Sequence, residues 1–175
     1  MTLRLLSLGN DSDARALAAR GLFESGREEE AIAQAEKLLR DDPAHYQTHY
    51  LLGQIYSARG EIWHAMLEFG RVLRSHRRHR DTLRGLGDLH FKMNAFEDAR
   101  KCYQRLLKEN SRDASAWLRI AATDFAMGRD LDALDAFRRA ARFDPTLTEA
   151  GHSLGDYYSL LRTLRPRSGR GSDER

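Results

Sequence analysis

The stretch RSHRRHR, residues 74–80, combines four arginines and two histidines with no acidic residue. Arginine side chains form paired hydrogen bonds with phosphates and carboxylates, so such a run is typical of a site for RNA or for an acidic protein surface. The same run between two helices would be only a charged turn. We keep both interpretations open for this secondary basic patch, which consists of Arg74, Arg77, Arg78 and Arg80.

Two histidine pairs, His45/His49 and His76/His79, have the spacing at which side chains of one helix can share a zinc or nickel ion. Neither pair has a cysteine or an acidic residue placed by the sequence to complete four ligands. His45 and His79 are as far apart as Leu52 and Leu86, an interval that recurs along the chain. The two histidines therefore occupy the same position of a repeated pattern, which indicates turn residues. We therefore predict no metal site and no cofactor.

The sequence contains no motif that indicates catalysis. It lacks a glycine-rich phosphate loop, a His-Glu-x-x-His pair and a Gly-x-Ser-x-Gly turn. Cys102 is the sole cysteine, which excludes an internal disulfide, and its position beside Tyr103 in a helix favours a small packing residue over a nucleophile. We predict that the protein is not an enzyme.

Charge and hydropathy restrict the remaining classes of protein. The net charge is only +3, so any basic function must be local. The basic residues comprise 25 arginines and 4 lysines, a bias typical of a GC-rich bacterial genome. No run of about 18 apolar residues exists, and Arg4 interrupts the short apolar start of the chain. We therefore expect no membrane span, no secretory signal and a cytoplasmic location.

The chain repeats itself at one constant interval, the distance from residue 52 to residue 86, and this periodicity is the strongest signal in the sequence. The pair Leu52-Gly53 recurs as Leu86-Gly87 and as Leu154-Gly155. Three further columns keep the same interval: the alanines Ala31, Ala65, Ala99 and Ala133; the rings Phe69, Tyr103 and Phe137; and the turn residues Gly26, Gly60, Asn94 and Gly128. Four columns with one period and no insertion predict an array of identical structural repeats.

Each repeat reads as two helices separated by a turn. Residues 46–60 place apolar side chains three and four apart, and Gly60 then ends the helix in the left-handed conformation that glycine and, next best, asparagine adopt. Residues 61–75 form the second helix. Gly53 and Gly87 should let the two helices of a repeat approach closely. A bulkier residue at either position would push the helices apart and lower the stability of the fold by about 1–3 kcal/mol.

This pattern resembles the tetratricopeptide repeat, through Leu52, Gly53, Tyr56, Ala65 and Phe69 in the second repeat and their counterparts in the others. The resemblance implies an all-α, right-handed α-solenoid of about four helix-turn-helix repeats plus a C-terminal capping helix. We expect an N-terminal cap segment over 1–11 and a repeat array over 12–164. The array would consist of repeats 12–45, 46–79, 80–113 and 114–147 and the capping helix 148–164, followed by a disordered basic tail over 165–175.

In this family the first helix of each repeat lines a concave wall that commonly holds a peptide or a partner helix. We name the outward residues of those helices the first-helix surface, and we expect them to bind a partner protein. Arg84 and Arg119 are the residues expected to bind a carboxylate of the partner through paired hydrogen bonds. The surface consists of Arg20, Phe23, Tyr50, Gln54, Arg84, Asp88, Phe91, Leu118, Arg119, Phe125 and His152. The alternative is that some of these rings merely pack against neighbouring repeats.

Two other features remain open. His90 and Asp124 stand where the repeat has Tyr56, and a polar group at such a buried position needs a partner, for which Arg138 or Arg142 is available to Asp124. A functional polar cavity is the alternative. In the capping helix, Tyr157, Leu161 and Leu164 either pack on the preceding repeat or form a surface for self-association.

The sequence thus predicts a non-enzymatic adaptor that binds a protein segment and helps to assemble a complex. The competing hypothesis is binding of an acidic protein surface or RNA through residues 74–80 and the basic tail. Because this run has no interleaved aromatic residues for base stacking, nucleic acid is not the expected partner. A regulatory subunit of a larger machine would have the same sequence features as the adaptor.

Overall fold

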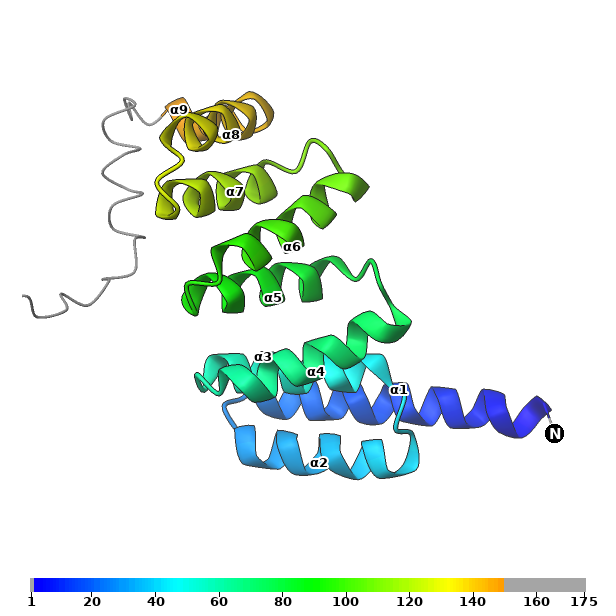
Figure 1. The fold of residues 1–175 in the computed structure, drawn as a ribbon. Helices are drawn as coiled ribbons and strands as arrows, with labels where there is room; N and C mark the ends of the chain where they lie inside the picture. Colours follow the sequence, from blue (N-terminus) through cyan, green and yellow to red (C-terminus); the bar gives the residue numbers. More distant parts are fainter. Residues whose placement is uncertain (1, 150–175) are drawn as a thin grey trace, which may run out of the picture. The chain divides into compact units, whose positions relative to one another are not determined.

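The computed structural model describes the backbone of residues 2–149 and the side chains of residues 11–147. These residues form helices and no strand, which confirms the predicted all-α class. The helices are α1 (Thr2–Glu24), α2 (Glu28–Asp41), α3 (Tyr46–Ala58), α4 (Ile62–Ser75), α5 (Arg80–Lys92), α6 (Phe96–Glu109), α7 (Ala114–Ala126), α8 (Asp130–Phe143) and the short α9 (Thr146–Glu149) (Figure 1). No helix within the described part of the chain is both long and apolar enough to cross a membrane.

The helix boundaries reproduce the sequence period. The helices α2, α4, α6 and α8 begin at residues 28, 62, 96 and 130, and α3, α5 and α7 begin at residues 46, 80 and 114. Each start follows the previous helix of its kind by the interval seen in the sequence. Since the same short pattern of apolar, small and turn residues recurs at this interval, each copy folds into the same hairpin of helices.

The turn inside each hairpin is fixed by one residue in the left-handed region. Gly26, Gly60 and Gly128 have φ between 74° and 80°, and Asn94 has φ of 60°. Glycine has no Cβ to clash in this conformation, and asparagine tolerates it better than most residues. The prediction for Gly60 and Asn94 is therefore confirmed.

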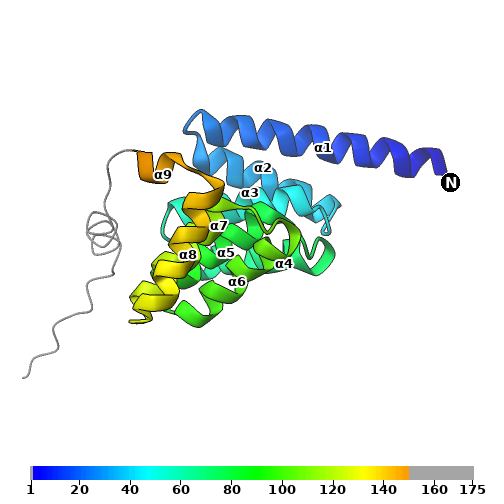
Figure 2. The same ribbon diagram turned by 90° about the horizontal axis from the view of Figure 1, so that it is seen from above.

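The helices belong to two compact units, residues 1–85 and residues 86–175, with the division inside α5. In the first unit α1 packs along α2 and α3 packs along α4 (Figures 1 and 2). Its core includes a cluster of Ala19, Ala31, Leu51 and Ile55, against which Leu22, Phe23 and Ile32 pack. Residues 2–11 of the expected N-terminal cap are part of α1.

The second unit is built in the same way. Here α7 packs against both α6 and α8, and the alanines Ala99 and Ala133 are fully buried at the contacts between helices. The rings of Tyr103 and Phe137 are buried beside them. Small residues at these positions let the helices approach, so the large rings can fill the core between them.

Glycines in the first helices of two repeats make room for these rings, as predicted. A Cβ on Gly53 would lie 2.4 Å from the ring of Phe69, and a Cβ on Gly87 would lie 2.4 Å from the ring of Tyr103. Both distances are far shorter than van der Waals contact. The glycines therefore set the spacing between the two helices of a hairpin.

Candidate partner-binding surfaces

In the first unit, two arginines of the first-helix surface act electrostatically on the hydroxyl of a third member, Tyr50. Burial raises the pKa of this phenol, as does the charge of Asp81, whereas Arg84 and Arg20 act in the opposite direction. Two guanidinium groups from α1 and α5 thus lie within electrostatic reach of one tyrosine on α3. Such a group of donors suits a carboxylate or another anionic group on a peptide.

Arg84 already has an acidic partner within the chain. Its guanidinium donates to Asp81, one turn earlier on α5, and both side chains are about half exposed. The ion pair holds Arg84 on the surface without burying it. A carboxylate from a partner would compete with Asp81 for Arg84, and the repeat pattern of the sequence does not indicate this competition.

The aromatic rings of the first-helix surface are only partly exposed. Phe23 packs against the core cluster of the first unit, and the ring of Phe91 contacts the ring of Phe96 edge-on at 5.4 Å between centroids. Tyr50 lies 4.9 Å from the ring of His79 and 6.0 Å from that of Phe69. These rings therefore contribute to packing, and each still presents part of its face to solvent.

In the second unit, Asp88 and Arg119 form one network with Tyr103. The carboxylate oxygen Oδ1 of Asp88 accepts hydrogen bonds from the Tyr103 hydroxyl, at 2.8 Å, and from Nη1 of Arg119. The guanidinium of Arg119 also lies over the Tyr103 ring, 5.9 Å from its centroid. Arg119, the second arginine predicted to bind a carboxylate, is thus also paired with an acidic residue of its own chain.

The other residues of the first-helix surface are placed as follows. Gln54, Leu118 and Phe125 are half-buried, on α3 and α7. His152 lies outside the described residues, as do Tyr157, Leu161 and Leu164, most of the capping helix and the basic tail. None of the described residues of the first-helix surface is fully buried, and these described residues divide into five in the first compact unit and five in the second.

The histidines of the basic turn have structural partners. The ring of His76 stacks on that of Tyr46, with 3.7 Å between centroids, and Nδ1 of His79 accepts a hydrogen bond from the backbone N–H of Thr82. His79 thereby caps the N-terminus of α5. Burial lowers its pKa, which favours the neutral ring that this cap requires.

The arginines of this turn are exposed, and at least three of them interact with other groups of the chain. Arg74, Arg77, Arg78 and Arg80 are all exposed to solvent, and none of Arg77, Arg78 and Arg80 is without a partner. Arg74 also borders a cavity of about 520 Å³ between α2, α3 and α4. In this turn the histidines therefore contact other residues of the chain, whereas the arginines carry positive charge at the surface.

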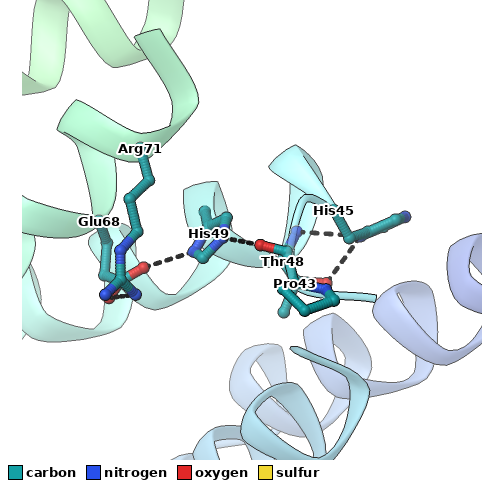
Figure 3. A network of polar contacts seen from close by, with 6 residues as sticks. All are labelled: Pro43, His45, Thr48, His49, Glu68 and Arg71. Carbon is teal, nitrogen blue, oxygen red and sulfur yellow. Dashed lines mark hydrogen bonds and ion pairs between the residues drawn. The ribbon is translucent and has the colours of Figure 1, made fainter. Parts of the chain in front are cut away.

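The other histidine pair is part of a polar network in the first unit (Figure 3). His45 accepts from the backbone N–H of Thr48 through Nδ1 and contacts Asp13 through Nε2, at 3.0 Å, so it caps α3 as His79 caps α5. His49 is buried, with Nδ1 2.6 Å from Glu68 and Nε2 3.0 Å from the carbonyl of Pro43. All four ring nitrogens thus have hydrogen-bond partners within the chain, and the described residues contain no group of three or more potential ligands for a metal ion.

Asp124 has a different partner from the one expected. Its Oδ1 accepts from Nε of Arg100 on α6, at 2.7 Å, and not from Arg138 or Arg142. The side of α7 that carries Asp124 faces α6, whereas Arg138 and Arg142 lie on the exposed side of α8. The helical phase predicted that Asp124 is buried, but not which neighbouring helix it contacts.

Cys102 is buried in α6, and burial raises the pKa of its thiol. A buried thiol with a raised pKa is a poor nucleophile, because the reactive form is the thiolate. This agrees with the predicted packing role.

Comparison with known proteins agrees with the repeat architecture. The family model described as tetratricopeptide repeat matches residues 16–74 and 84–147, which is more than half of the chain. No curated protein matches the sequence. Two crystal structures of MamA are each 22% identical to it; they cover 90% and 84% of this chain, align over 85% of their own length, and have TM-scores of 0.76 and 0.72. The structure of pilF from Pseudomonas aeruginosa is 18% identical, with a TM-score of 0.69 over 79% of this chain and 64% of its own.

Proposed function

Because this chain belongs to the tetratricopeptide repeat family, whose members generally serve as protein-interaction modules, we propose that it is a non-enzymatic adaptor. It binds an extended peptide or a helix of a partner protein on the first-helix surface and so helps to assemble a complex. The partner contributes an acidic group. The observation that carries this proposal is the positive charge of Arg84 and Arg20, which acts on the half-buried Tyr50 hydroxyl in the first unit.

The chemistry of this group explains the preference for an acidic segment. The charges of Arg84 and Arg20 act on the half-buried Tyr50 hydroxyl, and the charge of Asp81, which pairs with Arg84, opposes them. A carboxylate on the partner would accept hydrogen bonds from the arginines, while the exposed part of the Tyr50 ring supplies apolar contact area in the same unit. Charge-assisted bonds and aromatic anchors together are the usual source of affinity in such complexes.

The test compares two charge reversals in the first unit. The intact chain and its Arg84→Glu and Arg74→Glu variants are used to capture partners, which are quantified by mass spectrometry. We expect Arg84→Glu to lose the partner, because it places a second acid beside Asp81, and Arg74→Glu to retain it. Phe91→Ala should weaken capture through the second unit, with Leu131→Ala, a substitution of an exposed side chain on α8, as its control.

Circular dichroism must show equal helicity and melting for all variants. Equal recovery of the same partners by wild type, Arg84→Glu and Phe91→Ala would refute binding at the first-helix surface. Loss of the partner in Arg74→Glu alone would instead favour the basic patch.

A further inference from the structure

The second unit contains a cavity that the first-helix surface does not include. It has a volume of about 590 Å³ and lies between the second helices of two consecutive repeats, α6 and α8, with α7 at its base. It is lined by Arg100, Gln104, Leu107, Lys108, Ser111, Trp117, Ile120, Asp124, Asp132, Asp135, Ala136 and Arg139. The lining therefore combines charged side chains of both signs with an aromatic and aliphatic wall.

The cavity lies on the side of α7 away from the first-helix surface. Each residue of an α-helix advances by about 100°, so Trp117, Ile120 and Asp124 share one side of the helix. Leu118 and Phe125 point to the other side by the same rule. One helix thus separates two distinct surfaces of the second unit.

Asp124 at the base of the cavity has one carboxylate oxygen without a partner. The residue is 1% exposed, and its Oδ1 accepts from Nε of Arg100 at 2.7 Å. No group among the described residues donates to Oδ2, although this atom is buried. A buried carboxylate oxygen is strongly disfavoured without a donor, so this geometry calls for one from outside the chain.

The charges around Asp124 favour a cationic donor. Burial raises the pKa of this carboxyl, and the negative charge of Asp132 also raises it, while the hydrogen bond and charge of Arg100 and the charge of Arg129 lower it. Arg139 donates to Asp135 at 2.9 Å and its guanidinium lies over the Trp117 ring, 4.8 Å from the centroid. Arg100 and Arg139 are therefore both paired with acidic residues of the lining. Lys108 also lines the cavity, but Asp132 is the acid whose charge acts on Asp124, and it adds attraction for a positive charge beside this carboxylate.

We propose that this cavity is a second binding site, which takes a basic side chain of a partner protein and places its cationic group against Oδ2 of Asp124. The methylene groups of the side chain contact Leu107 and Ile120, and its charge faces Asp124 and Asp132. Long basic side chains commonly pack their apolar stem along such walls while the charged end reaches a polar group. The protein origin of the cation rests on the adaptor function proposed above, whereas the cation site itself does not.

The two tryptophans of the chain allow a direct test with the intact protein. Trp117 lines the cavity, whereas Trp63 is 72% exposed on α4 in the other unit. N-acetyl-arginine methylamide, an arginine residue without neighbours, is titrated into ¹⁵N-labelled protein while the two indole N–H resonances are followed. We expect a saturable shift of the Trp117 resonance, assigned with Trp117→Phe, and no shift of the Trp63 resonance.

The neutral isostere N-acetyl-citrulline methylamide tests the role of charge. It keeps the shape of arginine but lacks the cation, so its binding should be at least about tenfold weaker, which corresponds to the loss of one charge-assisted hydrogen bond. Equal affinity for the two compounds would overturn the proposal. So would the absence of a saturable shift of Trp117 in the wild-type protein.

Asp124→Asn and Asp98→Asn form a matched pair of variants. Both remove one negative charge from the second unit, but Asp98 is an exposed residue paired with Lys101. Asp124→Asn should abolish the Trp117 shift and Asp98→Asn should keep it. The asparagine can still accept from Arg100, so circular dichroism should show the helicity of the wild type, and retained binding by a folded Asp124→Asn protein would refute the site.

Putrescine distinguishes a diffusible amine from a protein side chain. Binding at least about tenfold tighter than that of the arginine compound would overturn the assignment to a partner protein. Weaker binding of putrescine, together with an arginine-specific shift, supports it. A Trp117 shift with unchanged capture by Arg84→Glu would contradict the first-helix adaptor and leave the cation site intact.

Discussion

At the scale of single residues, equivalent positions of the repeat carry different chemistry. His49 and Trp117 occupy the same position two repeats apart, and so do Arg71 and Arg139. His49 is held between Glu68 and the carbonyl of Pro43, and Arg71 donates to Glu68 (Figure 3). Trp117 instead lies under Arg139 and donates its indole N–H to the carbonyl of Ser111. The helix backbone is the same, so the side chains alone decide what each repeat can bind.

Tyr103 gives a prediction at this scale. Burial is the main cause that raises the pKa of its hydroxyl, and the neighbouring carboxylate of Asp88 raises it further. An unfolded chain loses this proton near pH 10, while the folded chain retains it. The free energy of unfolding should therefore fall above pH 10, by about 1.4 kcal/mol per pH unit for this one proton.

The measurement is urea unfolding, followed by circular dichroism between pH 8 and pH 11. Tyr103→Phe lowers stability at pH 8, because it removes the hydrogen bond to Asp88, but it should have a shallower loss above pH 10 than the wild type. Parallel pH profiles for the two proteins would show that Tyr103 is not the group responsible.

At the scale of helices, one ring determines how three of them meet in the first unit. Phe69 on α4 lies between Gly53 on α3 and Gly85 on α5. A Cβ on Gly53 would be 2.4 Å from this ring, and a Cβ on Gly85 would be 2.9 Å from its other edge. The ring cannot move away from one glycine without approaching the other. Both positions therefore require glycine for packing, although both lie in helices where alanine is the better helix former.

Gly53→Ala and Gly70→Ala test this requirement as a pair with opposite expected signs. Gly53→Ala should lower the free energy of unfolding by about 1–3 kcal/mol, because the added methyl group overpacks the contact with Phe69. Gly70 lies in α4 with nothing within 4 Å of its added Cβ, so Gly70→Ala should raise stability by about 0.5–1 kcal/mol through helix propensity. Chemical unfolding measures both; two stabilising substitutions would contradict the packing argument.

At the scale of the whole molecule, positive charge is largely balanced by negative charge. The chain has 29 basic and 26 acidic residues, and the histidines of the basic turn pack against Tyr46 and cap α5. Proteins that bind nucleic acid tightly concentrate unopposed positive charge on one face. This distribution favours a protein partner with local charge complementarity over a nucleic acid.

The expected result with RNA follows from this charge. A fluorescent single-stranded RNA should bind no better than the non-specific range, with a Kd of about 10⁻⁴–10⁻⁶ M at physiological salt, as measured by anisotropy. The double variant Arg74→Glu/Arg77→Glu should change this weak binding little. Nanomolar affinity that falls steeply with salt and disappears in the double variant would establish the basic patch as an RNA site.

The sequence by itself determined the fold, because the signals for each helix and turn are local. Apolar spacing within a helix, glycine or asparagine at residues 26, 60, 94 and 128, and small residues opposite rings all act within one hairpin. The same local rules made His45 and His79 turn residues. Since these signals recur at one fixed interval, one correct repeat was enough to place the other helices.

Only the tertiary structure decided which charged groups meet and where a cavity opens. Arg119 pairs with Asp88, 31 residues earlier, and Asp124 pairs with Arg100, 24 residues earlier and on a different helix from the expected one. Such pairs depend on which helix faces which, and on the directions of long side chains, neither of which the repeat pattern encodes. The cavity above Asp124 arises for the same reason, since its lining comes from three helices that only packing brings together.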